Sequence, residues 1–265
     1  MARTAGPLDT TGHNASIFFD PKLPQYYAGL GLKPAEATFR SRHGEAWHNK
    51  ALLDLGVGSG RTTRFFAAET AHYVGVDISE PMLAVARAAF PTATFLQMDL
   101  RAIAALGKES FDCVLGAFGI LSAFTPAERL QLLADIHALL TPGGIFYFSV
   151  HNREWRRAGK TPPANFGWPP RRMAGALNPI SWNNYLRLRH LRREEADYAV
   201  FNDLAHHWRG VFYYIDRAAQ QRQLEAAGFT LLEIYGDDGR LLGPGDDVSA
   251  DGMLHYVCMK AERPA

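Results

Sequence analysis

The sequence predicts an α/β protein with a doubly wound, mostly parallel sheet of seven strands that ends in an antiparallel hairpin. Three observations lead to this fold class. Apolar runs typical of buried strands alternate with helical patterns between residues 51 and 150, with short links between them. The first run, residues 51–55, passes into three glycines spaced two apart. Two apolar runs near the C-terminus, residues 229–235 and 253–260, have no helical pattern between them and therefore predict a hairpin.

The composition is ordinary for a globular protein with a sizeable core. The 265 residues are 47% hydrophobic and 21% charged, and a formal net charge of +1 argues against a general binder of polyanions. Cys113 and Cys258 lie in apolar runs, so we expect buried thiols in a reducing compartment. Residues 1–11 lack the apolar segment of a secretory signal, and no apolar run approaches the roughly 20 residues of a membrane span. We therefore expect a cytoplasmic protein without membrane contact.

Residues 1–48 form an N-terminal arm ahead of the first strand. The first 35 or so are rich in Gly, Pro and aromatic residues, and residues 36–47 carry a weaker helical pattern. Termini placed on a rigid scaffold often carry function, so the arm predicts either a segment packed on the domain or a lid over the ligand site. Both interpretations stay open at this point.

The predicted core, residues 49–150, begins with the glycine loop and two further elements. Residues 61–70 are expected to form a helix after the loop, and residues 73–77 a second strand that ends in an acid. Ser79 is placed to cap the next helix, with Pro81 in its first turn.

The remaining core elements follow the same alternation. Residues 93–98 and 111–115 predict the third and fourth strands. Thr125 and Glu128 have the spacing of a capping box, which predicts a helix start with a proline at its first position. That helix is expected to end near residue 140, and residues 145–150 form the fifth strand.

Residues 151–213 interrupt this alternation. The segment contains four of the five tryptophans and has eleven Arg and Lys against five Asp and Glu, a surplus of six positive charges. It is too long for a plain connection, so we expect an inserted cap over the substrate. Such a cap would form an aromatic, partly cationic pocket, or else a structural cover with solvent-facing arginines. Residues 214–265 return to the core with a helix over 216–227 and the hairpin.

The glycine loop indicates the kind of ligand. A dinucleotide fingerprint needs G-x-G-x-x-G/A, whereas here Gly60 comes one residue early and Arg61 stands in its place. Asp54, two residues before Gly56, disfavours a pyrophosphate and favours a cationic ligand. The pattern Asp54-x-Gly56-x-Gly58-x-Gly60 resembles motif I of the class I S-adenosylmethionine-dependent methyltransferases, whose fold is the one predicted above. The resemblance covers about residues 50–150 by motif and 214–260 by topology.

The resemblance implies S-adenosylmethionine as the cofactor and S-adenosylhomocysteine as its product. Asp54, Asp77 and Asp99 stand at or near the ends of three successive strands, where ligands bind in an open parallel sheet. Asp54 is expected to face the methionine ammonium, Asp77 the ribose hydroxyls and Asp99 the adenine amino group. The full set of expected cofactor contacts is Asp54, Gly56, Val57, Gly58, Gly60, Asp77, Ile78, Met82, Met98, Asp99, Leu100, Gly116, Ala117 and Phe118.

The acceptor side of the site is weakly signalled, because an activated methyl group needs mainly alignment and exclusion of water. A base helps only where the acceptor loses a proton, and histidine suits that task near neutral pH. We expect the catalytic candidates to be His151, His206 and His207. The expected substrate contacts are Tyr26, Tyr27, Asn152, Trp182 and Tyr213. No metal is expected, since these histidines lack the spacing of a known ligand set.

The leading hypothesis is a methyltransferase that acts on an oxygen or nitrogen of a small-molecule acceptor. An RNA or protein methyltransferase that uses the basic insertion is the first alternative. The amino-group enzymes of nucleic acids carry an N/D-P-P-aromatic motif after the fourth strand, where this chain has Gly116-Ala117-Phe118-Gly119, so nucleic acid is disfavoured. A dehydrogenase is excluded by the third glycine. A non-catalytic S-adenosylmethionine-binding protein, the acceptor's identity and the oligomeric state stay open.

Overall fold

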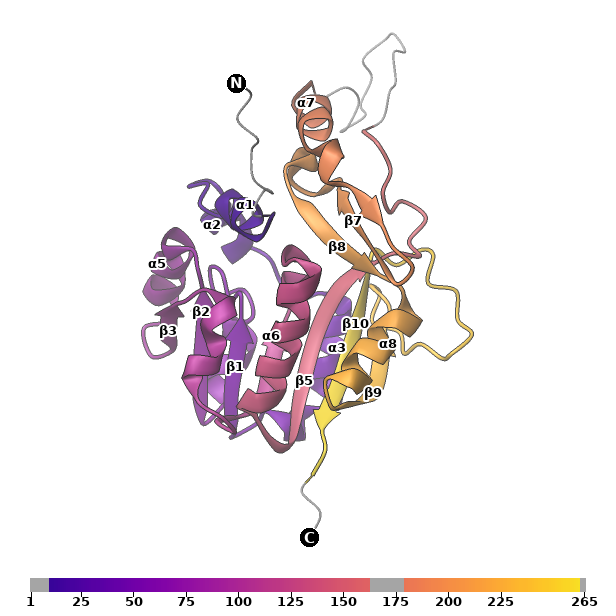
Figure 1. The fold of residues 1–265 in the computed structure, drawn as a ribbon. Coiled ribbons are helices and arrows are strands. Elements are labelled where there is room, and N and C mark those ends of the chain that lie inside the picture. Colours follow the sequence, from indigo (N-terminus) through magenta and orange to yellow (C-terminus); the bar gives the residue numbers. More distant parts are fainter. Residues whose placement is uncertain (1–9, 163–178, 263–265) are drawn as a thin grey trace.

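The computed structural model describes residues 10–162 and 179–262. Its centre is a twisted sheet with helices on both faces (Figure 1). Five parallel strands pair in the order β3-β2-β1-β4-β5. They are β1 (Ala51–Leu55), β2 (His72–Asp77), β3 (Thr94–Gln97), β4 (Phe111–Gly116) and β5 (Leu140–Asn152).

Two C-terminal strands complete the predicted seven. β10 (Met253–Lys260) runs antiparallel to both β5 and β9 (Phe229–Tyr235), between which it lies. The fold class expected from the sequence, a mostly parallel sheet with an antiparallel terminal hairpin, is therefore confirmed.

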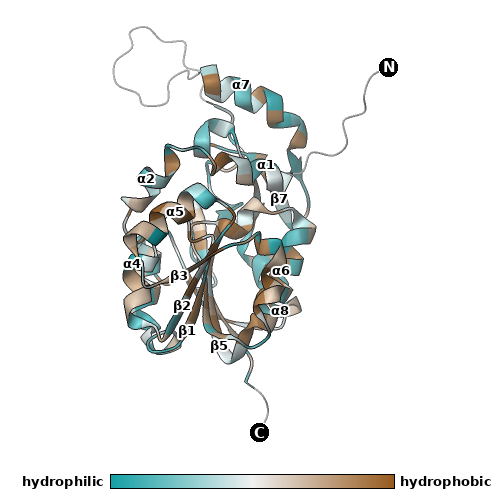
Figure 2. Cartoon of the chain, turned by 90° about the vertical axis from the view of Figure 1, so that its left-hand side faces the viewer, coloured by the Kyte–Doolittle hydropathy of each residue, from teal (hydrophilic) through white to brown (hydrophobic). Residues whose placement is uncertain are grey.

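Helices cover the two faces of the sheet, as Figure 2 shows for α4 and α5 on one side and α6 and α8 on the other. β5 supplies both cores, because side chains alternate along a strand. Phe146 and Phe148 pack into the core under α6 and α8, while Ile145 and Tyr147 pack into the core under α3, α4 and α5. The covering helices are η3 (Leu100–Leu106), α6 (Pro126–Leu139) and α8 (Arg217–Ala226), and opposite them α3 (Pro34–Arg42), α4 (Thr63–Phe66) and α5 (Glu80–Ala89).

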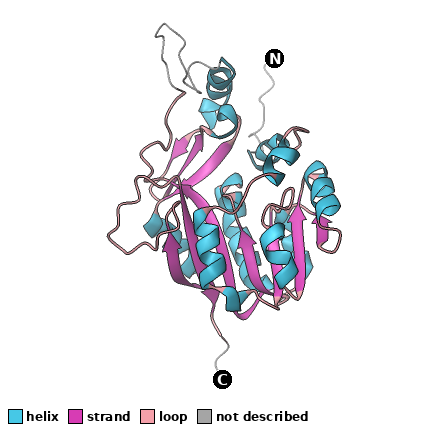
Figure 3. Ribbon diagram, turned by 180° about the vertical axis from the view of Figure 1, so that it is seen from behind, coloured by secondary structure: helices cyan, strands magenta, loops and turns pink. Residues whose placement is uncertain are grey.

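The insertion extends the sheet instead of standing apart from it. β5 runs beyond the end of β4, and its last residues pair in parallel with β8, His151 opposite Tyr214. Figure 3 shows this extension rising above the core, with α7 at its top. The expected boundary at residues 213 and 214 falls inside β8, and residues 163–178 of the predicted cap lie outside the described residues. The elements are α7 (Pro179–Leu188), η5 (Arg189–Leu191), β6 (Arg193–Glu194), β7 (Tyr198–Asn202), η6 (Ala205–Trp208) and β8 (Val211–Ile215).

The N-terminal arm lies across the carboxyl edge of the sheet (Figure 1). The buried Asn14 side chain donates to Val211 O at 2.6 Å and accepts from Val211 N at 2.9 Å, so it pairs with β8 as a neighbouring strand would. Thr11 donates to Glu128 at 2.5 Å. Residues 1–9 of the predicted arm are outside the described residues. The arm contains α1 (Thr10–Ile17), α2 (Leu23–Ala28), α3 and the short 3-10 helix η1 (Gly44–Ala46), and further short 3-10 helices outside the arm are η2 (Ala67–Glu69) and η4 (Ile120–Ala123).

The helix caps and element boundaries that the sequence predicted are only partly present in the structure. The capping box of Thr125 and Glu128 is present at the start of α6. Ser79 occupies the N-cap of α5, but its hydroxyl donates to Phe18 O at 2.8 Å instead of capping the helix. The prediction of a helix over residues 61–70 was wrong at its start, because residues 61 and 62 are a turn and the regular α-helical part spans only α4. The fifth strand is longer than predicted at both ends.

Both cysteines are buried and free, as expected of core residues. Among the described residues, no helix is long and apolar enough to cross a membrane.

Candidate functional site

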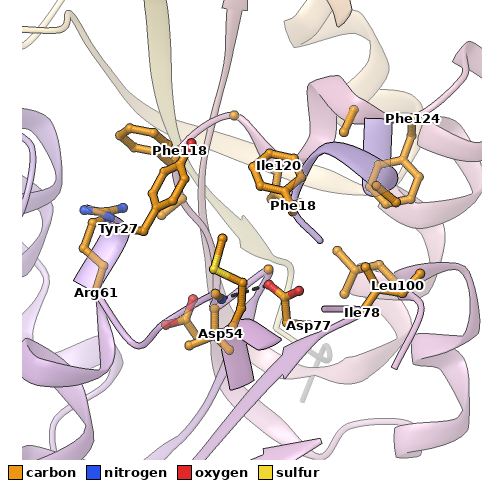
Figure 4. Close-up of a pocket in the computed structure, with 18 of the residues that line it drawn as sticks. Phe18, Tyr27, Asp54, Arg61, Asp77, Ile78, Leu100, Phe118, Ile120 and Phe124 are labelled. Atoms are coloured by element: carbon orange, nitrogen blue, oxygen red, sulfur yellow. Dashed lines mark hydrogen bonds between the residues drawn. The ribbon is translucent and has the colours of Figure 1, made fainter. Parts of the chain in front are cut away.

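A cavity opens at the carboxyl ends of the parallel strands, beneath the N-terminal arm. The loops after β1, β2, β3 and β4 line it, and α1, α2, β8 and β10 close it. Figure 4 shows Arg61, Tyr27 and Phe118 at one end, Asp54 and Asp77 below, and Ile78, Leu100 and Phe124 at the other end. The predicted residues that line it are Tyr27, Asp54, Gly56, Val57, Gly58, Asp77, Ile78, Met82, Asp99, Leu100, Ala117, Phe118, His151 and His206.

The glycine loop turns sharply between β1 and α4. Gly58 has a φ of +56°, a conformation that side-chain-bearing residues rarely adopt, and a Cβ there would meet no heavy atom closer than Gly56 O at 4.0 Å. Gly60 is required for a different reason: a Cβ there would come within 2.8 Å of the Phe90 ring. The loop therefore presents no side chain to the cavity at Gly58, and it packs tightly against Phe90 at Gly60.

Asp77, the last residue of β2, fixes this loop from below. Its Oδ2 accepts the Gly58 N–H at 2.8 Å (Figure 4), and its Oδ1 accepts the Ser79 N–H at 2.8 Å. Burial raises the pKa of the carboxyl, while these main-chain donors lower it. Each oxygen keeps a second lone pair for a ligand.

Asp54 is buried at the end of β1, beside the cavity. Its Oδ2 accepts hydrogen bonds from the hydroxyls of Thr62 and Tyr73, the latter at 2.6 Å. Burial raises the pKa of Asp54 to about 6 in spite of these donors. A cationic ligand group nearby would favour the ionised carboxylate.

Arg61 and Glu36 form a buried ion pair that the sequence did not indicate. The guanidinium donates to both carboxylate oxygens, at 2.5 and 2.7 Å, and the two side chains are 7% and 2% exposed. Arg61 also lies 5.0 Å from the ring centre of Phe118. Since Glu36 belongs to α3 and Arg61 to the glycine loop, the pair fixes the arm against the floor of the cavity.

Asp99 lines the cavity, but its carboxylate is already engaged. Arg101 donates to both of its oxygens, with the shortest contact at 2.6 Å, and this side-chain hydrogen bond lowers the pKa of Asp99. The expected contact with an adenine amino group would have to share that carboxylate with Arg101.

Two of the three predicted histidines, His151 and His206, line the same cavity. His151 is the penultimate residue of β5 rather than the residue after the strand, and its Nε2 is 3.8 Å from Asp203 Oδ2. His206 Nε2 is 3.3 Å from the Tyr27 hydroxyl, so the arm and the insertion meet here. Burial lowers the pKa of both histidines and raises the pKa of Tyr27 to about 12. Phe212 and Met253, which the sequence did not indicate, also line the cavity.

Four predicted contacts from the arm and core do not line the cavity. Tyr26 is 63% exposed. Met98 packs against the hydrophobic core. Gly116 lies in β4, where the side chains of Leu121 and Phe148 are its nearest neighbours. Gly60 is turned towards Phe90, as described above.

Four predicted contacts from the insertion also lie elsewhere. Two of these positions have the same cause, because consecutive residues of a strand face opposite sides of the sheet. His151 lines the cavity, so its neighbour Asn152 faces away from it, and Phe212 lines the cavity, so its neighbour Tyr213 faces away from it. Asn152 instead donates to Val248 O and Asp251 O. Trp182 lies on α7 against Tyr185, and the carbonyl of His207 accepts from Asn184.

Among the residues that the structure describes, no three His, Cys, Asp or Glu side chains are grouped so that they could hold a metal ion.

Comparison with known families and proteins gives the following similarities. Residues 52–144 match a family model described as a methyltransferase domain. An uncharacterized methyltransferase of Synechocystis sp. is 33% identical over 45% of this chain and 51% of its own length. An N,N-dimethyltransferase of Streptomyces venezuelae named for dTDP-3-amino-3,4,6-trideoxy-alpha-D-glucopyranose is 35% identical over 45% of this chain and 52% of its own length. The chain thus spans about half the length of these curated relatives.

Solved structures share the fold over most of the chain. A 1,6-didemethyltoxoflavin-N1-methyltransferase of Burkholderia thailandensis, with 1,6-didemethyltoxoflavin and S-adenosylhomocysteine bound, has a TM-score of 0.60 at 20% identity and covers 99% of this chain and 93% of its own. An S-adenosylmethionine-dependent methyltransferase of Mesorhizobium loti has a TM-score of 0.56 at 21% identity and covers 81% and 92%. At these identities the likeness establishes the fold.

Proposed function

Residues 52–144 are a methyltransferase domain within a class I methyltransferase fold, and on this premise we propose that the protein transfers a methyl group from S-adenosylmethionine to an oxygen or nitrogen of a small-molecule acceptor. The observation that carries this proposal is one cavity that is lined both by the glycine loop and Asp77 and by His151 and His206. The names of two similar proteins, an amino-sugar N,N-dimethyltransferase and a toxoflavin-precursor N1-methyltransferase, point to small-molecule acceptors in this group.

The residues at the glycine-loop end fit S-adenosylmethionine. Asp77 keeps one lone pair on each oxygen for the ribose hydroxyls, after its bonds to the main chain. Ile78 and Leu100 offer apolar side chains for the adenine ring, and the Asp54 carboxylate is placed to attract a cationic ammonium. A bare loop with two buried carboxylates beside it suits this ligand better than a pyrophosphate.

The cofactor, when bound, supplies a methyl group that its sulfonium has already activated. The residues of this chain would then align the acceptor and exclude water. Thr11, Ala15, Phe18 and Tyr27 of the arm line the cavity from above, which gives it a cover suited to that task.

The same cover favours a small acceptor over a polymer. Two cationic side chains occur in the described lining, and each is ion-paired: Arg61 with Glu36, and Arg101 with Asp99 and Glu128. A nucleic acid would require an open groove with cations for its phosphates.

The test has two stages. Calorimetry with S-adenosylhomocysteine measures cofactor-site binding directly, and we expect a dissociation constant in the micromolar range or tighter. S-adenosylhomocysteine release is then followed with three acceptor pools: total RNA, denatured protein, and the small-molecule fraction of a cell extract. We expect turnover with the small-molecule pool alone.

Each other result contradicts a defined part of the proposal. Absence of S-adenosylhomocysteine binding overturns the cofactor assignment. Turnover with RNA or protein overturns the small-molecule acceptor. Tight binding without turnover in all three pools favours a non-catalytic binding protein.

A further inference from the structure

The 3-10 helix η6 of the insertion has an unusual backbone. His206, His207 and Trp208 have φ angles of +51°, +57° and +60°, so three residues in a row lie in the left-handed region. Residues with a Cβ adopt this conformation mostly one at a time, because the Cβ comes close to the following carbonyl oxygen. A run of three that ends in a bulky tryptophan persists only where surrounding contacts hold it.

Contacts within the insertion hold the last two residues of this left-handed turn. Asn184 of α7 donates to His207 O at 3.0 Å. The Trp208 ring is buried, and its Nε1 donates to Lys160 O at 3.3 Å. The turn is therefore fixed on the side of α7.

The N-terminal arm holds the turn from the other side. The His206 ring stands edge-on to the Phe18 ring with the centroids 5.4 Å apart, and its Nε2 lies 3.3 Å from the Tyr27 hydroxyl. His13 Nε2 donates to Arg209 O at 2.7 Å, directly after the turn. The conformation of the turn thus depends on the arm as well as on the insertion.

Strained backbone gathers around Tyr27. Six residues other than glycine have a positive φ in the described parts of the chain, and Tyr27 contacts two of them. One is His206, and the other is Phe118, whose φ is +58° and whose ring centroid lies 6.0 Å from that of Tyr27. Phe18, Tyr27, Phe118 and His206 all line the cavity. Such strain is typical of ligand clamps and switch regions, so the meeting point of arm and insertion is a candidate for movement.

We propose that the turn at residues 206–208 is a latch for the cavity. It keeps its left-handed form while the arm is docked, and when the arm lifts, the turn relaxes and withdraws His206 from the cavity lining. The backbone strain favours the open form, whereas the contacts of Phe18, Tyr27 and Asn184 favour the closed form. Because the cavity lies beneath the arm, its ligands enter and leave when this contact opens. This inference concerns access to the cavity and goes beyond the proposed methyl transfer.

The first experiment measures amide hydrogen exchange on the full, ligand-free chain. His207→Gly relieves one left-handed position, because glycine adopts that conformation without strain. We expect exchange in the turn and in residues 10–28 of the arm to become about threefold slower or more. His207→Ala removes the same side chain but keeps the Cβ, so it should not slow exchange in either segment. Equal exchange in the two variants, or faster exchange in His207→Gly, overturns the latch.

A second variant should act in the opposite direction. Asn184→Ala removes the hydrogen bond to His207 O, and Asn184 belongs to neither the arm nor the cavity lining. We expect exchange in residues 10–28 to become about threefold faster or more. Asn183→Ala, at an exposed position of the same helix, is the matched control and should leave the arm unchanged. Faster exchange that stays confined to the insertion shows that arm and turn open separately, which overturns the inference.

The third experiment measures the association and dissociation rates of S-adenosylhomocysteine by surface plasmon resonance. A latch controls both rates, so His207→Gly should lower both and Asn184→Ala should raise both, each by about threefold, with less change in the dissociation constant. Unchanged rates in both variants overturn the role of the turn in access. If S-adenosylhomocysteine does not bind the wild-type protein, the proposed function fails, and the exchange experiments still decide the latch.

Discussion

Arg61 on the glycine loop and Glu36 on α3 form two parallel hydrogen bonds, at 2.5 and 2.7 Å, where neither side chain is more than 7% exposed. The pair joins a segment before the first strand to the loop after it. The same Glu36 carboxylate accepts the Lys33 N–H at 2.8 Å at the start of α3. The position of the loop therefore depends on the arm as well as on the sheet.

Breaking this pair should be costly. Glu36→Gln leaves the Arg61 charge buried without its counter-charge, and loss of one partner of a buried pair typically costs about 3–5 kcal/mol. We expect a decrease of that order in the free energy of unfolding, measured with urea. Glu80→Gln is the matched control, because its pair with Arg87 is about half exposed and surface pairs contribute about 0–1 kcal/mol. Similar losses in both variants would contradict this account.

Asp77 should control affinity for the cofactor. Asp77→Asn keeps one oxygen but removes the charge, and hydrogen bonds to charged groups contribute about 1.5–3 kcal/mol. We expect S-adenosylhomocysteine to bind at least about tenfold more weakly by calorimetry. Asp238→Asn, an exposed acid outside the cavity, should leave affinity unchanged. Equal affinity of Asp77→Asn and wild type would remove Asp77 from the ribose role.

Asp54 should make stability depend on pH. Its pKa in the folded protein is about 6, above the roughly 3.9 of an unfolded chain, so the folded state holds the proton more tightly. Between these two values the folded state binds more protons, and its stability therefore falls as pH rises. A gap of about two units corresponds to about 3 kcal/mol.

The contribution of Asp54 alone is measured as the difference in the free energy of unfolding between wild type and Asp54→Asn. Asp77 also has a raised pKa and contributes in the same direction, but it is common to both proteins. We expect the free energy of unfolding of wild type, relative to the variant, to decrease between pH 4 and pH 7. A difference that is constant across this range would show that Asp54 keeps an ordinary pKa.

Asn14 should hold the arm closed. Its side chain satisfies both main-chain groups of Val211 and also donates to Ala123 O at 2.8 Å. Asn14→Ala leaves buried groups unpaired, at about 1–3 kcal/mol. We expect amide hydrogen exchange in residues 10–28 to become at least about tenfold faster. Ser16→Ala, which removes an exposed bond to His13 O, is the control. Equal exchange in both variants would show that Asn14 does not hold the arm.

The parts of the fold and site that sequence reasoning predicted depend on local patterns. The glycine spacing, the acids at the ends of β1 and β2, and the Thr125 capping box lie within a few residues of the features that they support. The period of two along β5 and β8 separates the two faces of each strand, although it does not say which face looks into the cavity. Asn152 and Tyr213 were assigned to the site for this reason, while Phe212 and Met253 were missed.

The pairing of distant segments had no such signal. Glu36 and Arg61 are 25 positions apart, and Asn14 meets Val211 across 197. Ser79 lies at the N-cap position that the sequence predicted, but its hydroxyl donates a hydrogen bond to the Phe18 carbonyl of the arm. A residue with several available partners bonds to whichever one the fold brings nearest, and that choice is made by packing.

The sequence by itself determined the fold class and the acids that surround the glycine loop, because hydrophobic period and glycine spacing act on the chain locally. Only the tertiary structure decided that residues 206–208 are left-handed, which strand face lines the cavity, and that the insertion's described arginines lie outside it. These features depend on strand register and on side chains that meet from separate elements, and a one-residue change in register would reverse every face.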